Sequence, residues 1–187
     1  MELFKEYSNR FKKILDSQNW DNSYLLANDM RVAWQSGKRL YICGNGGSAG
    51  NAIHLANDFN YGIAKMTGIG LRVMALPANS AVISCIANDI SYSEIFSQQL
   101  AVHGEPGDIL IVLSGSGNSP NVVRALEKAK ELDMKSFAIL GYAGGKCKDL
   151  ADVSIHFPID DMQIAEDMQL VVGHMIMQWL CKNPVIR

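Results

Sequence analysis

Two groups of side chains, far apart in the sequence, have the residue types and spacing of a metal or proton-transfer site. His54 and Asp58 lie four residues apart in "AIHLANDF", so they share one face of a helix. In "AEDMQLVVGH", Asp167 and His174 share a face, and Glu166 is rotated by about 80° from His174. Two histidines and two carboxylates can hold a divalent cation such as zinc, and can equally perform general acid–base catalysis. A histidine inside an apolar run such as "VVGHMIM" is also common in a protein core, so the pattern leaves that alternative open.

Two glycine–serine loops could hold an anion. They are "GNGGS" at 44–48 and "SGSGNS" at 114–119, and each follows an apolar stretch and precedes a helical one. Glycines let the backbone approach a ligand closely, and serine hydroxyls with the free N–H groups of a helix start suit a phosphate monoester. The alternative is an ordinary strand-to-helix turn with serine as the helix N-cap. Neither loop has a dinucleotide-binding or Walker A register, so we expect no nucleotide cofactor.

The elements around these residues alternate between strand and helix. Because crossover helices join the predicted strands, we expect a five-stranded parallel sheet in a three-layer, doubly wound α/β sandwich. We treat residues 1–36 as a helical extension and 37–187 as the α/β core of one domain. In such sheets ligands bind beyond the carboxyl ends of the strands, here the loops after Cys43 and Leu113. The predicted strands are 39–43, 71–77, 108–114, 135–140 and 153–158, and the predicted helices are 3–16, 23–34, 48–59, 81–87, 92–102, 121–133 and 164–182.

Composition excludes several classes of partner. The chain has 187 residues and a formal net charge of -2, which gives no long-range attraction to nucleic acid or to an anionic membrane. No apolar run is long enough to span a bilayer. The four cysteines are scattered without a CxxC pair, as expected of reduced thiols in a cytoplasmic protein.

The order and spacing of several segments resemble one family over nearly the whole chain. With "CGNGGSAGNAIHLANDF", "ALPANSAVISCIANDISYSEIFSQQL", "GDILIVLSGSGNSPNVV" and the closing histidine-bearing helix, the sequence resembles the sugar isomerase (SIS) domain family, most closely the phosphoheptose isomerases. The resemblance implies a flavodoxin-like SIS fold and a homotetramer with the N-terminal helices at its core. It also implies an aldose–ketose isomerisation through an enediol, from sedoheptulose 7-phosphate to glycero-manno-heptose 7-phosphate.

The same resemblance implies roles for individual residues. Asp58 and His174 take the catalytic positions. One zinc ion per subunit would be held by His54, Asp58, Glu166 and His174. The substrate positions are Asn45, Gly46, Gly47, Ser48, Asp89, Ser114, Gly115, Ser116, Ser119 and Glu166.

This chain departs from the isomerase pattern in its site residues. Asp58 stands where the isomerases have Glu, Glu166 where they have Gln, and Gln169 where they have a further histidine. Gly115 replaces a Thr, and Gly62 stands in the segment that carries a basic residue. Two hypotheses follow: an isomerase with a retuned site, or a non-catalytic SIS protein that binds a sugar phosphate or the replication initiator.

Overall fold

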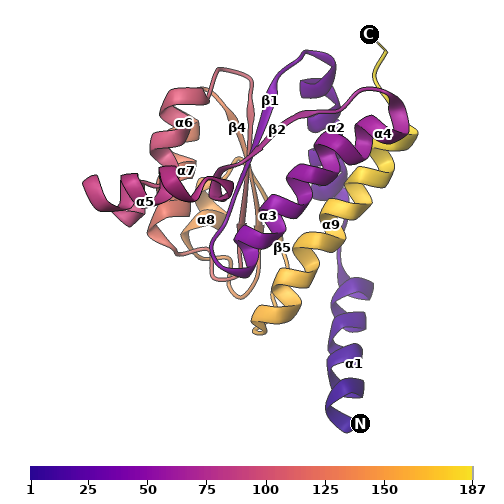
Figure 1. Ribbon diagram of the computed structural model, residues 1–187. Helices are drawn as coiled ribbons and strands as arrows, with labels where there is room; N and C mark the ends of the chain where they lie inside the picture. The colour runs from indigo at the N-terminus through magenta and orange to yellow at the C-terminus, as the bar shows by residue number, and fades with distance from the viewer. Residues whose placement is uncertain (187) are drawn as a thin grey trace.

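A sheet of five parallel strands forms the centre of the computed structural model, which describes residues 1–186 (Figure 1). The strand order is β2-β1-β3-β4-β5. Strand β2 is therefore added on one side of β1, and β3, β4 and β5 are added on the other side, so the switch point lies between β1 and β3. This is the flavodoxin-like order, and it confirms the predicted α/β class. The strands are β1 (Arg39–Cys43), β2 (Arg72–Ala75), β3 (Ile109–Ser114), β4 (Lys135–Leu140) and β5 (Val153–His156).

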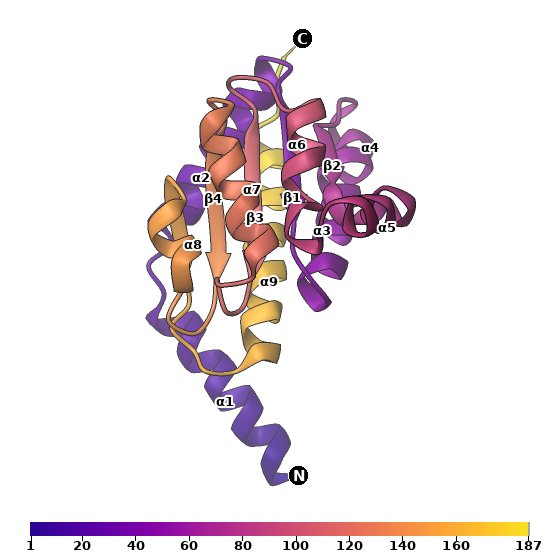
Figure 2. The same ribbon diagram turned by 90° about the vertical axis from the view of Figure 1, so that its left-hand side faces the viewer.

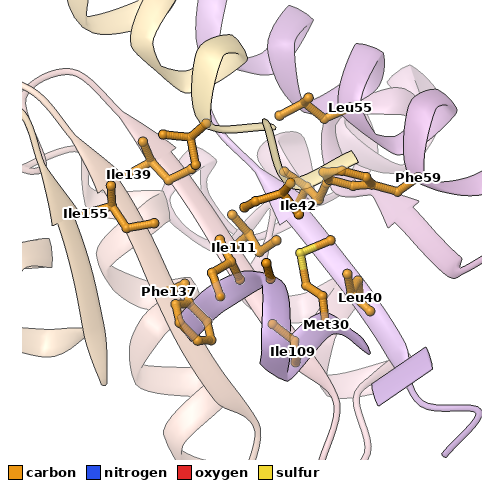
Figure 3. Close-up of a cluster of buried hydrophobic side chains, with 14 of the residues drawn as sticks. Met30, Leu40, Ile42, Leu55, Phe59, Ile109, Ile111, Phe137, Ile139 and Ile155 are labelled. Atoms are coloured by element: carbon orange, nitrogen blue, oxygen red, sulfur yellow. The ribbon is translucent and has the colours of Figure 1, made fainter. Parts of the chain in front are cut away.

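Helices cover both faces of the sheet, which completes the three layers (Figures 1 and 2). Alternate residues of each strand point to opposite faces. Leu40 and Ile42 pack against α2, α3 and α9, whereas Tyr41 and Cys43 pack against α6 and α7. Figure 3 shows the larger cluster, where Leu55 and Phe59 meet the isoleucines of the sheet. The helices are α1 (Glu2–Ser17), α2 (Asp21–Gln35), α3 (Gly47–Asn57), α4 (Ile63–Thr67), α5 (Ser80–Asp89), α6 (Ser97–His103), α7 (Pro120–Glu131), α8 (Gly145–Leu150) and α9 (Met162–Lys182).

The predicted helix at 48–59 is not regular throughout. A π-helical turn, Asp58–Gly62, separates α3 from α4. π-helical turns are rare and commonly lie at functional sites. This one begins at Asp58, one of the predicted catalytic residues.

Helices α3 and α9 lie side by side (Figure 1) and run in the same direction. Gly47 lies against Glu166, Leu55 against Gly173, and Gly62 against Met177. The pairing therefore keeps a nearly constant offset along both helices. We call this contact between α3 and α9 the α3–α9 seam. Along it, residues from distant parts of the sequence lie opposite one another.

Helix α1 extends away from the body of the domain (Figures 1 and 2). It is fixed to the start of α9 by a hydrogen bond from Tyr7 Oη to Asp167 and by an ion pair between Arg10 and Asp161 at 2.7 Å. Leu3 and Phe4, near its free end, are 69% and 77% exposed. Over residues 1–186, no helix is both long and apolar enough to cross a membrane.

Candidate active site

The two glycine–serine loops line one cavity of about 240 Å³. It lies at the carboxyl ends of β1 and β3, which are neighbours in the sheet. This is the edge at which the topology predicts a ligand. The lining residues are Asn45, Gly46, Gly47, Ser48, Leu113, Ser114, Gly115, Ser116, Ser119, Met162 and Glu166.

Glycines allow the loops to close around this cavity. Gly46 has a φ of +54°, a conformation that side-chain-bearing residues rarely adopt. A Cβ atom at Gly47 would lie 2.2 Å from the Glu166 carboxylate, and one at Gly115 would lie 2.5 Å from Met162 Sδ. The absence of a side chain at Gly115 is therefore matched by the methionine on α9.

Two serines of the second loop accept hydrogen bonds from backbone N–H groups, which leaves their own protons free. Ser114 Oγ accepts a hydrogen bond from Gly117 N at 3.0 Å, and Ser116 Oγ accepts one from Asn118 N at 3.3 Å. Each hydroxyl proton remains available to a ligand oxygen.

Ser119 is the N-cap residue of α7, but its side chain makes no cap hydrogen bond. Pro120 has no N–H, and Val122 N already donates to Ser119 O at 3.2 Å. The first-turn N–H group that remains for an anion is therefore that of Asn121.

Asn45 is held by residues that the sequence did not single out. Its side-chain amide and that of Asn121 exchange two hydrogen bonds of 2.8 Å, and Tyr92 Oη donates to Asn45 Oδ1 at 3.2 Å. Asn121 is 1% exposed, so this pair fixes the first loop against the start of α7. A polar residue at the second position of a helix gave no signal by itself.

His54, Asp58 and His174 form a compact cluster on the α3–α9 seam. The two Nε2 atoms lie 2.9 Å apart, and Asp58 Oδ2 lies 3.3 Å from His54 Nε2 and 3.5 Å from His174 Nε2. The side chains of the two histidines are 49% and 45% exposed. They are therefore not core residues, and this excludes the alternative that the apolar pattern had left open.

The cluster fits a tetrahedral cation. With bonds of about 2.0–2.2 Å, neighbouring ligand atoms of a tetrahedral zinc site lie roughly 3.3–3.5 Å apart. The three distances in the cluster are close to that spacing, and the ligand atoms of all three residues lie within 4.8 Å of one another. Two imidazoles and one carboxylate are also a common ligand set for catalytic zinc, which keeps a further position for substrate or water.

Three acidic side chains lie outside the histidine cluster, and one of them, Glu166, lies where its predicted substrate-binding role places it. Glu166 lines the cavity and is not part of the histidine cluster, because it precedes His174 by about 12 Å along α9. Asp167 contacts Tyr7 on α1. Asp89 ends α5 and accepts hydrogen bonds from Asn88 and Cys85, which lower the pKa of its carboxyl, and it does not line the cavity.

Comparison with known proteins shows the family of the chain. The SIS domain family matches residues 3–141. A phosphoheptose isomerase from Helicobacter pylori (strain HPAG1) is 40% identical over 138 residues, which cover 74% of this chain and 71% of the relative. The chain belongs to the phosphoheptose isomerase family of SIS-domain proteins.

Solved structures extend the likeness of this SIS-domain protein to its whole length. A phosphoheptose isomerase from Neisseria gonorrhoeae superposes with a TM-score of 0.87 at 29% identity, covering 97% of this chain and 96% of that one. A phosphoheptose isomerase from Francisella tularensis gives a TM-score of 0.89 at 26% identity with the same coverage. The N-terminal helices are thus included in the match.

Proposed function

We propose that this chain is an aldose–ketose isomerase that converts sedoheptulose 7-phosphate to glycero-manno-heptose 7-phosphate. The observation that carries the proposal is the pairing of an oxyanion cavity with a histidine–carboxylate cluster along one helix seam. From Ser48 to His54 the distance along α3 is about 9 Å. The ligand must therefore be elongated, with an anionic end and a reactive end, as an open-chain sugar with a terminal phosphate is.

The serine hydroxyls and the helix-start N–H groups bind the phosphate. Among residues 1–186, no lysine or arginine lines the cavity. Recognition therefore depends on neutral donors, which fix the position of the phosphate without a salt bridge. The sugar chain extends from there towards the histidine cluster.

Asp58 and His174 move the protons. A carboxylate oxygen of Asp58 removes a proton from the carbon beside the carbonyl and returns it to the former carbonyl carbon. In the metal-free site, His174 Nε2 transfers a proton between the two neighbouring oxygens, so that the enediol collapses to the isomeric carbonyl compound. Hydrogen lost by one carbon is gained by the other, so the step needs no external oxidant or reductant.

We further propose a bound zinc ion, held by His54, Asp58 and His174. Such a cation would polarise the sugar carbonyl and lower the energy of the enediolate. With such a cation bound, His174 Nε2 would be a ligand, and polarisation of the sugar oxygens by the cation would replace its proton transfer, while the second oxygen of Asp58 would stay free for the carbon-bound proton. Elemental analysis of protein purified without chelator should find about one zinc per chain, and an H54A variant should lose it.

The direct test is incubation with sedoheptulose 7-phosphate, with and without added zinc, while aldose formation is followed. Turnover is expected. No turnover with this or any other ketose phosphate would leave the second candidate, a non-catalytic sugar-phosphate-binding SIS protein. The complete histidine cluster favours the enzyme over that alternative.

We also propose, from the family resemblance, that the chain works as a cytoplasmic homotetramer. Exposed Leu3 and Phe4 on the protruding α1 are consistent with a contact between subunits. Light scattering in solution tests it. A monomer would contradict it.

A further inference from the structure

A buried hydrogen-bond chain runs from α9 to the cavity wall and ends on Ser48. Gln169 Nε2 donates to Ser48 Oγ at 3.0 Å, and Asn51 Nδ2 donates to Gln169 Oε1 at 2.9 Å. Asn51 Nδ2 also donates to the backbone oxygen of Glu166 at 3.0 Å. Gln169 and Ser48 are 1% and 3% exposed, so bulk water does not compete for these bonds.

The direction of this chain is fixed by its backbone end. A peptide carbonyl can only accept, so the atom of Asn51 that faces Glu166 must be the amide nitrogen. The same nitrogen then presents its second N–H to Gln169, which must answer with its oxygen. The Gln169 nitrogen is thereby turned towards Ser48, whose oxygen accepts.

Ser48 is left with one free proton. A hydroxyl has one hydrogen and two lone pairs, and the bond from Gln169 occupies a lone pair. Among residues 1–186, Ser48 Oγ donates no hydrogen bond to a protein acceptor, and the residue lines the cavity. The hydroxyl can therefore donate only towards whatever the cavity holds.

We propose that Asn51 and Gln169 are positioning residues that make Ser48 a fixed hydrogen-bond donor to an oxygen of the phosphorylated ligand. This rests on the proposed function for the identity of the ligand, but not on turnover. A serine whose hydroxyl rotates freely could offer a lone pair to the anion, which is repulsive. The polarised chain removes that orientation before the ligand arrives.

The test reverses the donor–acceptor direction of the hydrogen-bond chain with a substitution that keeps almost the same side-chain shape. In Q169E the new carboxylate has no donor of its own. It still accepts from Asn51, and it takes the Ser48 proton. The dissociation constant for sedoheptulose 7-phosphate, and for inorganic phosphate as a second probe, should rise by about tenfold or more.

A double-mutant cycle separates polarity from the added negative charge. In an S48A background, Q169E should change either dissociation constant by less than about threefold, because there is no hydroxyl left to reverse. A purely electrostatic or structural effect would persist at full size in that background. N51D provides a second route: it forces Gln169 to present its oxygen to Ser48, and its effect should likewise vanish in S48A. Thermal unfolding of every variant shows that the fold is retained.

The outcomes distinguish the two proposals. Weaker binding in Q169E that S48A cancels supports the inference, even if the wild-type chain turns nothing over. Unchanged binding in both Q169E and N51D overturns it, even if the wild-type chain is an active isomerase. A wild-type chain that binds neither probe also overturns it, and leaves the isomerase proposal to the turnover assay.

Discussion

Leu55 packs directly onto Gly173 in the seam between α3 and α9. A Cβ atom at position 173 would lie 2.2 Å from Leu55 Cδ2, far inside contact distance. The neighbouring residues, His54 and His174, belong to the cluster that holds Asp58. The spacing of the two histidines therefore depends on a glycine that has no chemistry of its own.

Substitution G173A should separate the helices. We expect a loss of about 1–3 kcal/mol of unfolding free energy from overpacking, and a larger proportional loss of zinc and of activity. Denaturant unfolding and elemental analysis measure the two effects. G50A is the matched control: it lies in the same helix pair, but its Cβ would meet nothing within 4 Å, so stability and metal content should be retained. Full zinc occupancy in G173A would show that the seam does not set the cluster.

Replacement of His174 by leucine tests the catalytic assignment. The side chain is about half exposed, so the fold should survive, whereas activity should fall by at least about a hundredfold. Activity and thermal unfolding are compared with those of H103Q, an exposed histidine at the end of α6. Equal activity in the two variants would remove His174 from the mechanism.

Glu166 places a carboxylate in a cavity whose lining, as far as residue 186, includes neither lysine nor arginine. Substitution E166Q should tighten binding of sedoheptulose 7-phosphate by a few-fold, because it removes a negative charge from the neighbourhood of a phosphate. Calorimetric titration measures this. E105Q is the control for net charge, since Glu105 precedes the amino end of β3, whereas the cavity lies at the carboxyl ends of the strands. Weaker binding in E166Q would mean instead that the carboxylate contacts the substrate directly.

The bond between Tyr7 and Asp167 should make the docking of α1 sensitive to alkaline pH. This hydrogen bond raises the pKa of Tyr7 from 10.0 to about 12. Because the folded-state pKa is the higher one, its stabilising contribution is complete below pH 10 and is lost as the pH rises through about 12. Hydrogen exchange or limited proteolysis of α1 should show release of the helix in that range. Y7F should show weaker docking already at neutral pH, and identical profiles for the two proteins would refute the assignment.

Much of the architecture could be predicted because its signals are local. Strands β1, β3 and β4 are continuous apolar runs bounded by turn residues, and their observed limits agree with prediction to within a residue. Helix α8 is short, has few apolar residues and follows Gly144, which has a left-handed conformation. Its sequence therefore shows no helical periodicity of apolar residues. Strand β2 ends before Leu76 because a short 3₁₀ turn containing Pro77 follows it.

The sequence predicted the residue types of the site better than it predicted which of these residues lie together. Loop glycines and serines reveal an anion site through residue type alone. Separation of Glu166 from the histidine cluster depends on distance along α9, which a helical wheel does not represent. The roles of Asn51 and Gln169 depend on contacts between residues more than a hundred positions apart.

The π-helical turn at Asp58–Gly62 also bears on how relatives should be aligned. A turn closed by i→i+5 bonds holds one residue more than a turn of α-helix, and the α-helix continues in the same direction after it. A relative with a regular α-helix here should therefore be one residue shorter, and an alignment without a gap would shift every later position of the helix by about 100°. Insertions and deletions at this place change the phase of the helix, so they decide which side chains face α9.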